Sequence, residues 1–269
     1  MNRLETLCGS LKALLAITSL LLVSVAAAAD SPADLAPLYA REVDRRLEVP
    51  AAEQGAYART MEEALWGAQI VASTNQYVVL VDRNPNVQAV MLFWRSTTGD
   101  AVFIGASPAS TGRPGGFEHF KTPIGVFTHS LANPDFRAEG TKNERGICGY
   151  GAKGMRVFDF GWVTARQTWG KKAENLMRLQ MHSTDARLLE PRLGTAQSKG
   201  CIRIPASLNQ FIDRYGILDA DYEQAIAAGK TFWVLRLDRA PTPWSGRYLV
   251  VVESAHKTRP AWSPLPASQ

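Results

Sequence analysis

Residues 77–94 read YVVLVDRNPNVQAVMLFW. Two apolar runs, rich in β-branched and aromatic side chains, flank a short polar stretch, and such runs favour strands over helices. The tripeptide Asn84-Pro85-Asn86 between the runs is a turn signal. The stretch therefore predicts a β-hairpin, and we expect the rest of the sheet to be built outward from it.

The chain after this hairpin stays rich in strand-like segments. We expect a third strand at 101–106, a return to the sheet at 122–127, a closing strand at 231–237 and a last strand at 247–253. A helical turn at 185–190 and helices at 208–215 and 220–228 are the additions. This order predicts a mainly β fold with helical additions, of the α+β class, rather than a parallel α/β fold.

The chain before residue 76 is helical in pattern. Apolar residues recur at helix-like spacing from 31 to 72, with a break at Pro50. We expect two amphipathic helices in an N-terminal segment, 30–75, which packs on the flank of a main domain, 76–238. A C-terminal extension, 239–269, is expected to contribute one strand.

The first residues have the features of an export signal. Arg3 and Lys12 flank an apolar run that is short for a membrane span, and three alanines precede Asp30. We expect a cleaved signal peptide at 1–29 that leaves no stable membrane span. The alternative is an uncleaved N-terminal anchor.

The charge and the ligand-type residues narrow the function classes. The net charge of +5 indicates a mild preference for anionic partners, but no run of Lys and Arg alternates with aromatic residues as in nucleic-acid-binding faces. No Cys-x-x-Cys or His-x-x-x-His spacing is present, so we predict no metal and no cofactor. A nucleic-acid partner is not expected either.

The residues that indicate chemistry are Ser198-Lys199-Gly200-Cys201-Ile202-Arg203, preceded by His182. A thiol becomes a good nucleophile when a base removes its proton or a positive environment stabilises the thiolate. His182 offers a base, Lys199 and Arg203 offer positive charge, and Gly200 permits a tight turn whose amides can bind a substrate oxygen. The alternative is a hydrogen-bonded structural histidine and a buried cysteine at a turn.

The spacing of these residues resembles the signature of the YkuD-type L,D-transpeptidases. His182, a gap of fifteen residues, and then Ser-x-Gly-Cys, an apolar residue and Arg carry the resemblance, together with TGRP at 111–114 and TPIGVF at 122–127. It covers roughly 76–237 and implies a β-sandwich-like domain. It further implies Cys201 as nucleophile, His182 as general base held through the main-chain carbonyl of Ser183, and the amides around Gly200 and Cys201 as oxyanion donors.

The resemblance also implies substrate contacts near this motif. Arg203 would support the loop or pair with a substrate carboxylate, and Ser198 and Lys199 would lie beside it. Many members carry His where this chain has Lys199, so this cation would favour an anionic donor peptide or would simply point to solvent.

By the same resemblance, the protein would be a periplasmic enzyme of peptidoglycan. Cys201 would form a thioester with a stem peptide, release D-alanine, and pass the acyl group to an amine on a second stem or on an outer-membrane lipoprotein. A carboxypeptidase or crosslink hydrolase would use water instead, and a non-catalytic wall-binding module is the remaining alternative. A sortase would separate its His and Cys much farther in the sequence.

Several other side chains complete the sequence-based expectations. Cys148 is expected to be a free thiol, with a disulfide to Cys201 as the alternative, and it lies in a long polar loop at 133–154 that could cover a site. Cys8 precedes the apolar run and has no expected role. His119 and His129 are expected in solvent-exposed loops. Asp159 and Trp162 could form a substrate-binding wall, although we expect Trp162 in the core.

Overall fold

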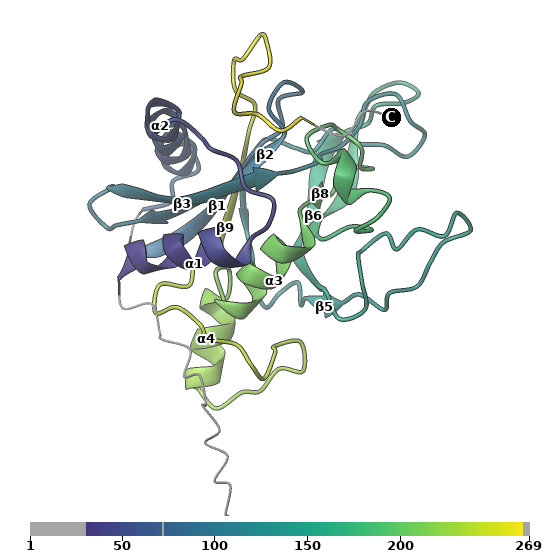
Figure 1. The fold of residues 1–269 in the computed structure, drawn as a ribbon. Coiled ribbons are helices and arrows are strands. Elements are labelled where there is room, and N and C mark those ends of the chain that lie inside the picture. The colour runs from purple at the N-terminus through teal and green to yellow at the C-terminus, as the bar shows by residue number, and fades with distance from the viewer. Residues whose placement is uncertain (1–30, 72, 266–269) are drawn as a thin grey trace, which may run out of the picture.

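The computed structural model describes residues 31–71 and 73–265, so the predicted signal peptide at 1–29 lies outside the described residues. A five-stranded sheet forms the centre, in the order β3-β2-β1-β9-β4 (Figure 1). Its strands are β1 (Gln76–Asp82), β2 (Ala89–Arg95), β3 (Ala101–Pro108), β4 (Gly125–Thr128) and β9 (Tyr248–Val252). β1 and β2 pair antiparallel, which confirms the predicted hairpin.

β9 occupies an interior position in this sheet. It pairs parallel with β1 and antiparallel with β4, although it comes from the C-terminal segment of the chain. The segment 239–269 therefore contributes a central strand to the sheet that 76–128 begins.

A second sheet, of four strands, packs against the first in the order β5-β6-β7-β8. Its strands are β5 (Phe136–Arg137), β6 (Arg156–Arg166), β7 (Glu174–His182) and β8 (Ile202–Arg203). Alternate residues of β1 and of β7 belong to one apolar core, which also includes Phe211 of α3 (Ala206–Arg214). The two sheets and α3 thus share one core.

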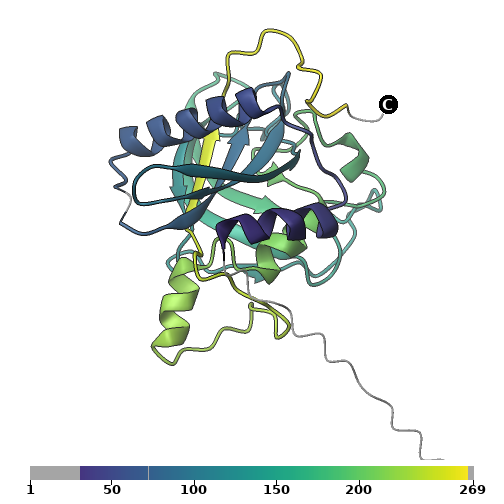
Figure 2. The same cartoon turned by 60° about the vertical axis from the view of Figure 1, so that its left-hand side comes forward.

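The other face of β1 is covered by a helix. Val78 and Leu80 pack in a second apolar cluster with Tyr57, Met61 and Leu65, which follow one another at intervals of four residues on one face of α2 (Ala51–Gly67). α1 (Leu35–Glu42) packs on the opposite face of the sheet (Figure 2). Because both faces are covered, every residue of β1 is buried, and residues 77–81 form a continuous apolar run. The fold is mainly β with helical additions, as predicted.

The remaining short elements are α4 (Ala220–Ala227) and the 3-10 helices η1 (Pro32–Asp34) and η2 (Glu190–Arg192). One expectation for a strand is wrong, whereas the last strand expected at 247–253 is confirmed by β9. Residues 231–237 form turns and no strand, and Trp233 is 76% exposed. The interior sheet position beside β1 is occupied by β9, residues 248–252, so the segment 231–237 has no place in the sheet. The pair β6 and β7 was not anticipated.

A buried charge network joins the second sheet to the helices. The Arg156 guanidinium is fully buried and bonds to Asp135 at 2.7 Å, Asp213 at 3.2 Å and Asp219 at 2.7 Å. Asp135 also accepts a 2.8 Å hydrogen bond from His129 Nε2. Burial opposes the charge on His129, but the carboxylate of Asp135 overcomes this and raises the His129 pKa. These bonds attach the start of β6 to the C-terminal end of α3 and to the segment before α4.

Candidate active site

Three segments of the sequence meet at the loop 198–201. The Ser198 amide donates to the Thr111 carbonyl at 3.0 Å, and the Arg113 amide donates to the Ser198 carbonyl at 2.9 Å. The Ser110 and Arg203 backbones exchange two hydrogen bonds of 2.9 Å. The TGRP segment therefore lies directly beside the cysteine loop.

The TPIGVF segment reaches the same loop through one hydroxyl. Thr122 is fully buried, accepts a 2.9 Å hydrogen bond from the Gly112 amide and donates a 2.7 Å hydrogen bond to the Gly200 carbonyl. Gly112 permits this approach, because a Cβ there would lie 1.9 Å from the Phe120 carbonyl oxygen. The three motifs quoted from the sequence thus form one hydrogen-bonded assembly.

Gly200 is the turn residue of the loop, and only glycine fits there. Its φ of +139° is one that residues with a Cβ rarely adopt, and a Cβ would lie 2.8 Å from Met177 Cε. Its amide donates to Ser198 Oγ at 3.0 Å, and that hydroxyl donates to the Cys201 carbonyl at 2.5 Å. Ser198 is buried and holds the loop from within, and the Gly200 amide is engaged internally.

The register of β7 and β8 places the expected catalytic pair on one face. Met181 pairs with Ile202 and His182 with Arg203, and the first pair is buried in the core between the sheets. Side chains alternate along a strand, so His182 and Arg203 point to the opposite, outer face. Cys201 immediately precedes β8, so the same register, continued by one residue, brings Cys201 level with Gln180 and onto the face of His182 and Arg203.

His182 is oriented by its neighbour. The ring is 5% exposed, and its Nδ1 donates to the Ser183 carbonyl at 2.5 Å. Because Nδ1 carries the proton in this bond, Nε2 is the free acceptor of the neutral ring. Burial lowers the His182 pKa to about 4, aided by the charge of Arg203 and opposed by the Ser183 carbonyl.

The surroundings of the Cys201 thiol favour its protonated form. Burial raises its pKa, and the Gln180 amide and the charge of Arg203 only partly offset this effect. Its Sγ donates to the Arg178 carbonyl at 3.7 Å and makes no hydrogen bond to His182 in this structure. A rotation of the thiol toward His182 is needed before proton transfer, as is common in ligand-free sites.

Arg203 is a cation without a matching anion among the described residues. Its Nε has no hydrogen-bond partner, and its Nη1 makes a single 3.4 Å bond to the Gln197 carbonyl. Burial lowers its pKa, and Cys201 is the group whose charge opposes that effect. A half-buried guanidinium beside the nucleophile favours an anionic ligand.

The loop that carries Tyr150 covers the histidine. The Tyr150 and His182 rings lie 4.6 Å apart in an edge-to-face arrangement, and Ser183 Oγ donates to the Tyr150 carbonyl at 3.0 Å. Gly151, with a φ of +85°, permits this contact, since a Cβ there would lie 2.1 Å from Ser183 Oγ. Cys148 lies in the same loop, and both it and Cys201 are free cysteines.

The other predicted residues lie as follows. Lys199 is 65% exposed and pairs with Glu118 at 3.0 Å, so it points away from the thiol into solvent. His119 is partly exposed and bonds to the Arg113 carbonyl. The prediction for His129 is wrong, because it is 1% exposed and belongs to the Arg156 network.

The prediction that Trp162 lies in the core is also wrong, since it is 64% exposed. Phe158 and Phe160 are buried, and simple alternation would place Trp162 beside them. The register shifts between Asp159 and Trp162, and this bulge turns Trp162 to the outer face of the sheet. Asp159 is 1% exposed and lies beneath that face.

Four site residues were missed or underrated by sequence reasoning. Tyr150, Arg178 and Gln180 were not singled out, and Asp159 was named only as part of a wall. Tyr150 Oη donates to Gln180 Oε1 at 2.9 Å, and Gln180 Nε2 donates to Asp159 Oδ2 at 2.8 Å. Alternation along β7 back from His182 was the signal that could have identified Gln180 and Arg178.

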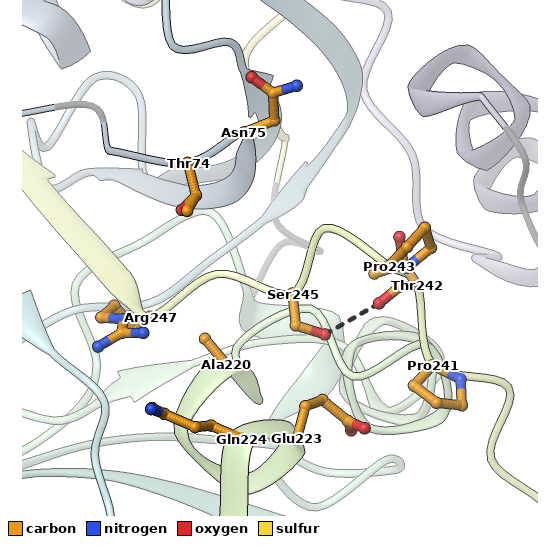
Figure 3. A pocket seen from close by; sticks show the side chains of 10 residues that line it. All are labelled: Thr74, Asn75, Ala220, Glu223, Gln224, Pro241, Thr242, Pro243, Ser245 and Arg247. Carbon is orange, nitrogen blue, oxygen red and sulfur yellow. Dashed lines mark hydrogen bonds between the residues drawn. The ribbon is translucent and has the colours of Figure 1, made fainter. Parts of the chain in front are cut away.

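A separate hollow of about 720 Å³ lies between α4, the start of β1 and the segment 241–247 (Figure 3). None of its lining residues belongs to the Cys201 site. Its charged side chains are paired within the protein, Glu223 with Arg239 and Arg247 with Asp221. Its lining includes no cysteine and no histidine.

The described ranges, 31–71 and 73–265, hold neither a metal-binding cluster nor a membrane-spanning helix. No group of three or more His, Cys, Asp or Glu in these ranges could hold a metal ion. Within 31–71 and 73–265, no helix has the length and apolar composition to cross a bilayer.

No family model and no curated protein matches the chain. Among solved structures, it is similar to the helical cell shape determining protein Pgp2 from Campylobacter jejuni, with 16% identity and a TM-score of 0.31, over 70% of this chain and 51% of that one. A single-residue mutant of the same protein gives 15% identity and a TM-score of 0.29, over 79% and 59%. The chain thus spans little more than half of the length of these proteins. At such low TM-scores, we infer neither fold nor function from the similarity.

Proposed function

We propose that this protein is a cysteine acyltransferase of the YkuD-type L,D-transpeptidase class that acts on peptidoglycan stem peptides. The observation that carries the proposal is the assembly around Cys201. The segments 111–114 and 122–127 bond to its loop, and His182 presents a neutral ring with a free Nε2 on the same sheet face. A buried structural cysteine would require none of these arrangements.

The proposed reaction begins with proton transfer. His182 Nε2 takes the proton of the Cys201 thiol as Sγ attacks the donor carbonyl, and the Cys201 amide binds the oxyanion, because the Gly200 amide is engaged by Ser198. The tetrahedral intermediate collapses to a thioester while His182 protonates the departing amine of D-alanine. An acceptor amine then attacks the thioester, and the thiol is restored.

Arg203 supplies the proposed recognition of the donor end. A stem peptide that ends in D-alanine carries a terminal carboxylate next to the attacked carbonyl. The unmatched guanidinium of Arg203 lies beside Cys201, and pairing with that carboxylate would complete its hydrogen bonds. A peptide without the terminal carboxylate should therefore be a poor donor.

The acceptor distinguishes a transferase from a hydrolase. The Tyr150 loop covers His182 and could limit the access of water to the thioester. We propose an amine on a second stem or on an outer-membrane lipoprotein as the acceptor. Such substrates lie in the periplasm, in agreement with the export signal predicted at 1–29.

The test is incubation of the protein with a disaccharide tetrapeptide, with and without an amine acceptor, followed by intact-protein and product mass spectrometry. We expect acylation of Cys201, release of D-alanine, and crosslinked product in excess over tripeptide when acceptor is abundant. Cys201→Ala should show no acylation, whereas Cys148→Ser should react like the parent. Equal tripeptide formation with and without acceptor, and no crosslinked product, would indicate the hydrolase instead.

A carbapenem offers a second probe of the nucleophile. A strained lactam should acylate the Cys201 thiol, with an adduct equal in mass to the intact drug. Acylation at Cys148, or of the Cys201→Ala variant, would contradict the assignment of the nucleophile.

A further inference from the structure

The outer face of the second sheet continues beyond the Cys201 site. Along β7, the residues on this face are His182, Gln180, Arg178 and Leu176, in that order from the catalytic end. The Tyr150 loop covers the first two, which are 5% and 6% exposed. The face then opens, because Leu176 is 59% exposed and Trp162, paired with Arg178, is 64% exposed.

Arg178 is held in place from beneath this open face. Its Nε donates to Asp159 Oδ2 at 2.8 Å, and its guanidinium lies 6.0 Å from the centre of the Trp162 ring. Asp159 is itself fixed, because it accepts hydrogen bonds of 2.8 Å from the Gly161 amide and from Gln180 Nε2. The internal bonds use only the Nε side of the guanidinium, and its two terminal nitrogens make no hydrogen bond within the described residues.

This arrangement is close to the nucleophile. The Cys201 thiol bonds to the carbonyl of Arg178, and Cys201 lies opposite Gln180. Arg178 follows one side-chain repeat along the strand, which is roughly 7 Å. An extended peptide advances about 3.3–3.6 Å per residue. A donor lying along β7 would thus place over Arg178 the group that lies roughly 7 Å before the attacked carbonyl.

We propose that Arg178 and Trp162 form an anion-binding subsite for a carboxylate that the donor carries roughly 7 Å before the attacked carbonyl. The terminal nitrogens of Arg178 bind the carboxylate in bidentate fashion, and Trp162 packs on the apolar part of the donor residue that carries this carboxylate. The inference rests on the proposed function. A purely structural ion pair would account for the bond to Asp159 but not for the exposed tryptophan and the outward-facing edge of the guanidinium.

The subsite can be tested by binding, without turnover. Two synthetic tripeptides, L-Ala-γ-D-Glu-L-Lys and its analogue with a carboxamide in place of the glutamyl α-carboxylate, would be titrated into the Cys201→Ala protein. Tryptophan fluorescence or calorimetry would report the two Kd values. We expect the carboxylate peptide to bind about tenfold more tightly, because the interaction is charge-assisted but partly exposed.

Variants separate this subsite from a general effect of positive charge. Each variant is made in the Cys201→Ala background. Arg178→Gln should reduce the preference for the carboxylate peptide over the carboxamide peptide to about twofold or less, and Arg178→Lys should retain only part of this preference. The matched control is Arg166→Gln, an arginine on the outer face of β6 beyond Trp162, which should keep the full preference. Circular dichroism melting would verify that each variant is folded.

The outcomes distinguish this inference from the proposed function. A Kd ratio near one in the parent, no binding of either peptide at millimolar concentration, or an unchanged ratio in a folded Arg178→Gln protein would overturn the subsite. A tenfold ratio that depends on Arg178 supports the subsite, and it does so even if the wild-type protein forms no thioester with a tetrapeptide. That last result would reject the acyltransferase proposal alone.

Discussion

Alkylation of Cys201 by iodoacetamide should become about tenfold faster with each pH unit between about 6 and 8, because only the thiolate reacts. Burial raises the pKa of this thiol and lowers the pKa of His182 to about 4. The resting pair is therefore a neutral thiol and a neutral imidazole. An imidazolium–thiolate pair would instead give a rate that is nearly constant over this range.

The magnitude rests on the His182 pKa of about 4 and on a Cys201 pKa that burial raises above the ordinary thiol value. The ordinary thiol value is about 8.5, so the pKa gap is at least about 4.5 units, and transfer of the proton costs about 6 kcal/mol. The thiol points to the Arg178 carbonyl and makes no hydrogen bond to His182 in this structure, so no contact between them offsets this cost. The ion pair then amounts to fewer than about one in a thousand molecules, and its pH-independent share of the rate is negligible above pH 6.

The assay uses the Cys148→Ser protein, so that a single reactive thiol remains, and follows the adduct by intact mass from pH 5 to 9. The His182→Gln variant serves as control, and its pH profile should run nearly parallel to that of the parent. A plateau from pH 5 to 8 that disappears in His182→Gln would refute the neutral-pair description and would require an activated thiolate at rest.

Three further outcomes are expected. Arg156→Met should lower the free energy of unfolding, measured in urea, by about 3–5 kcal/mol, because three buried aspartates lose their shared cation. The control Arg166→Met should change it by less than about 0.5 kcal/mol. A loss below about 1 kcal/mol for Arg156→Met would contradict the role of the network. Gly200→Ala should abolish acylation by tetrapeptide, whereas Gly149→Ala, in open space, should retain it; a normal rate for Gly200→Ala would show that the turn is not needed. The His182 pKa is lower in the folded protein than in the unfolded chain, so on acidification the unfolded chain takes up this proton first. From pH 7 to pH 4 the free energy of unfolding should therefore drop by about 3 kcal/mol through this group. Urea titrations of His182→Gln at the two pH values should lack that part of the drop.

The first sheet was predictable where the sequence pattern is local. The hairpin of β1 and β2 follows from its apolar runs and its turn, and the motif around Cys201 follows from residue types and spacing. The predicted strand at 231–237 has suitable side chains, but it lacks a place in the sheet because residues 248–252 pair with β1. Local propensity does not show which of two candidate strands takes a position.

The outer face of β6 and β7, with Trp162 and Arg178, was harder to predict, because it depends on one irregularity in the strand register. The register shift between Asp159 and Trp162 reverses which side chains of β6 face outward. Without it, Trp162 would be a core residue and Arg178 would have no aromatic neighbour. The polar residues and the glycine within 156–166 also weaken the strand pattern, so β6 and β7 were not recognised. The contact of Tyr150 with His182 joins a loop to a strand end, and no sequence periodicity reports such a contact.

The interior position of β9 has a consequence for how the chain folds. Val78 pairs with Tyr248, so two neighbouring strands are separated by 170 positions, and closing so long a loop is entropically costly and slow. During synthesis, β1 can form its hairpin with β2, but its second edge stays open until residue 252 has emerged. A chain that stops before this point presents an unpaired, apolar strand edge, the kind of surface on which chains aggregate. The central sheet is therefore the last part of the fold to close.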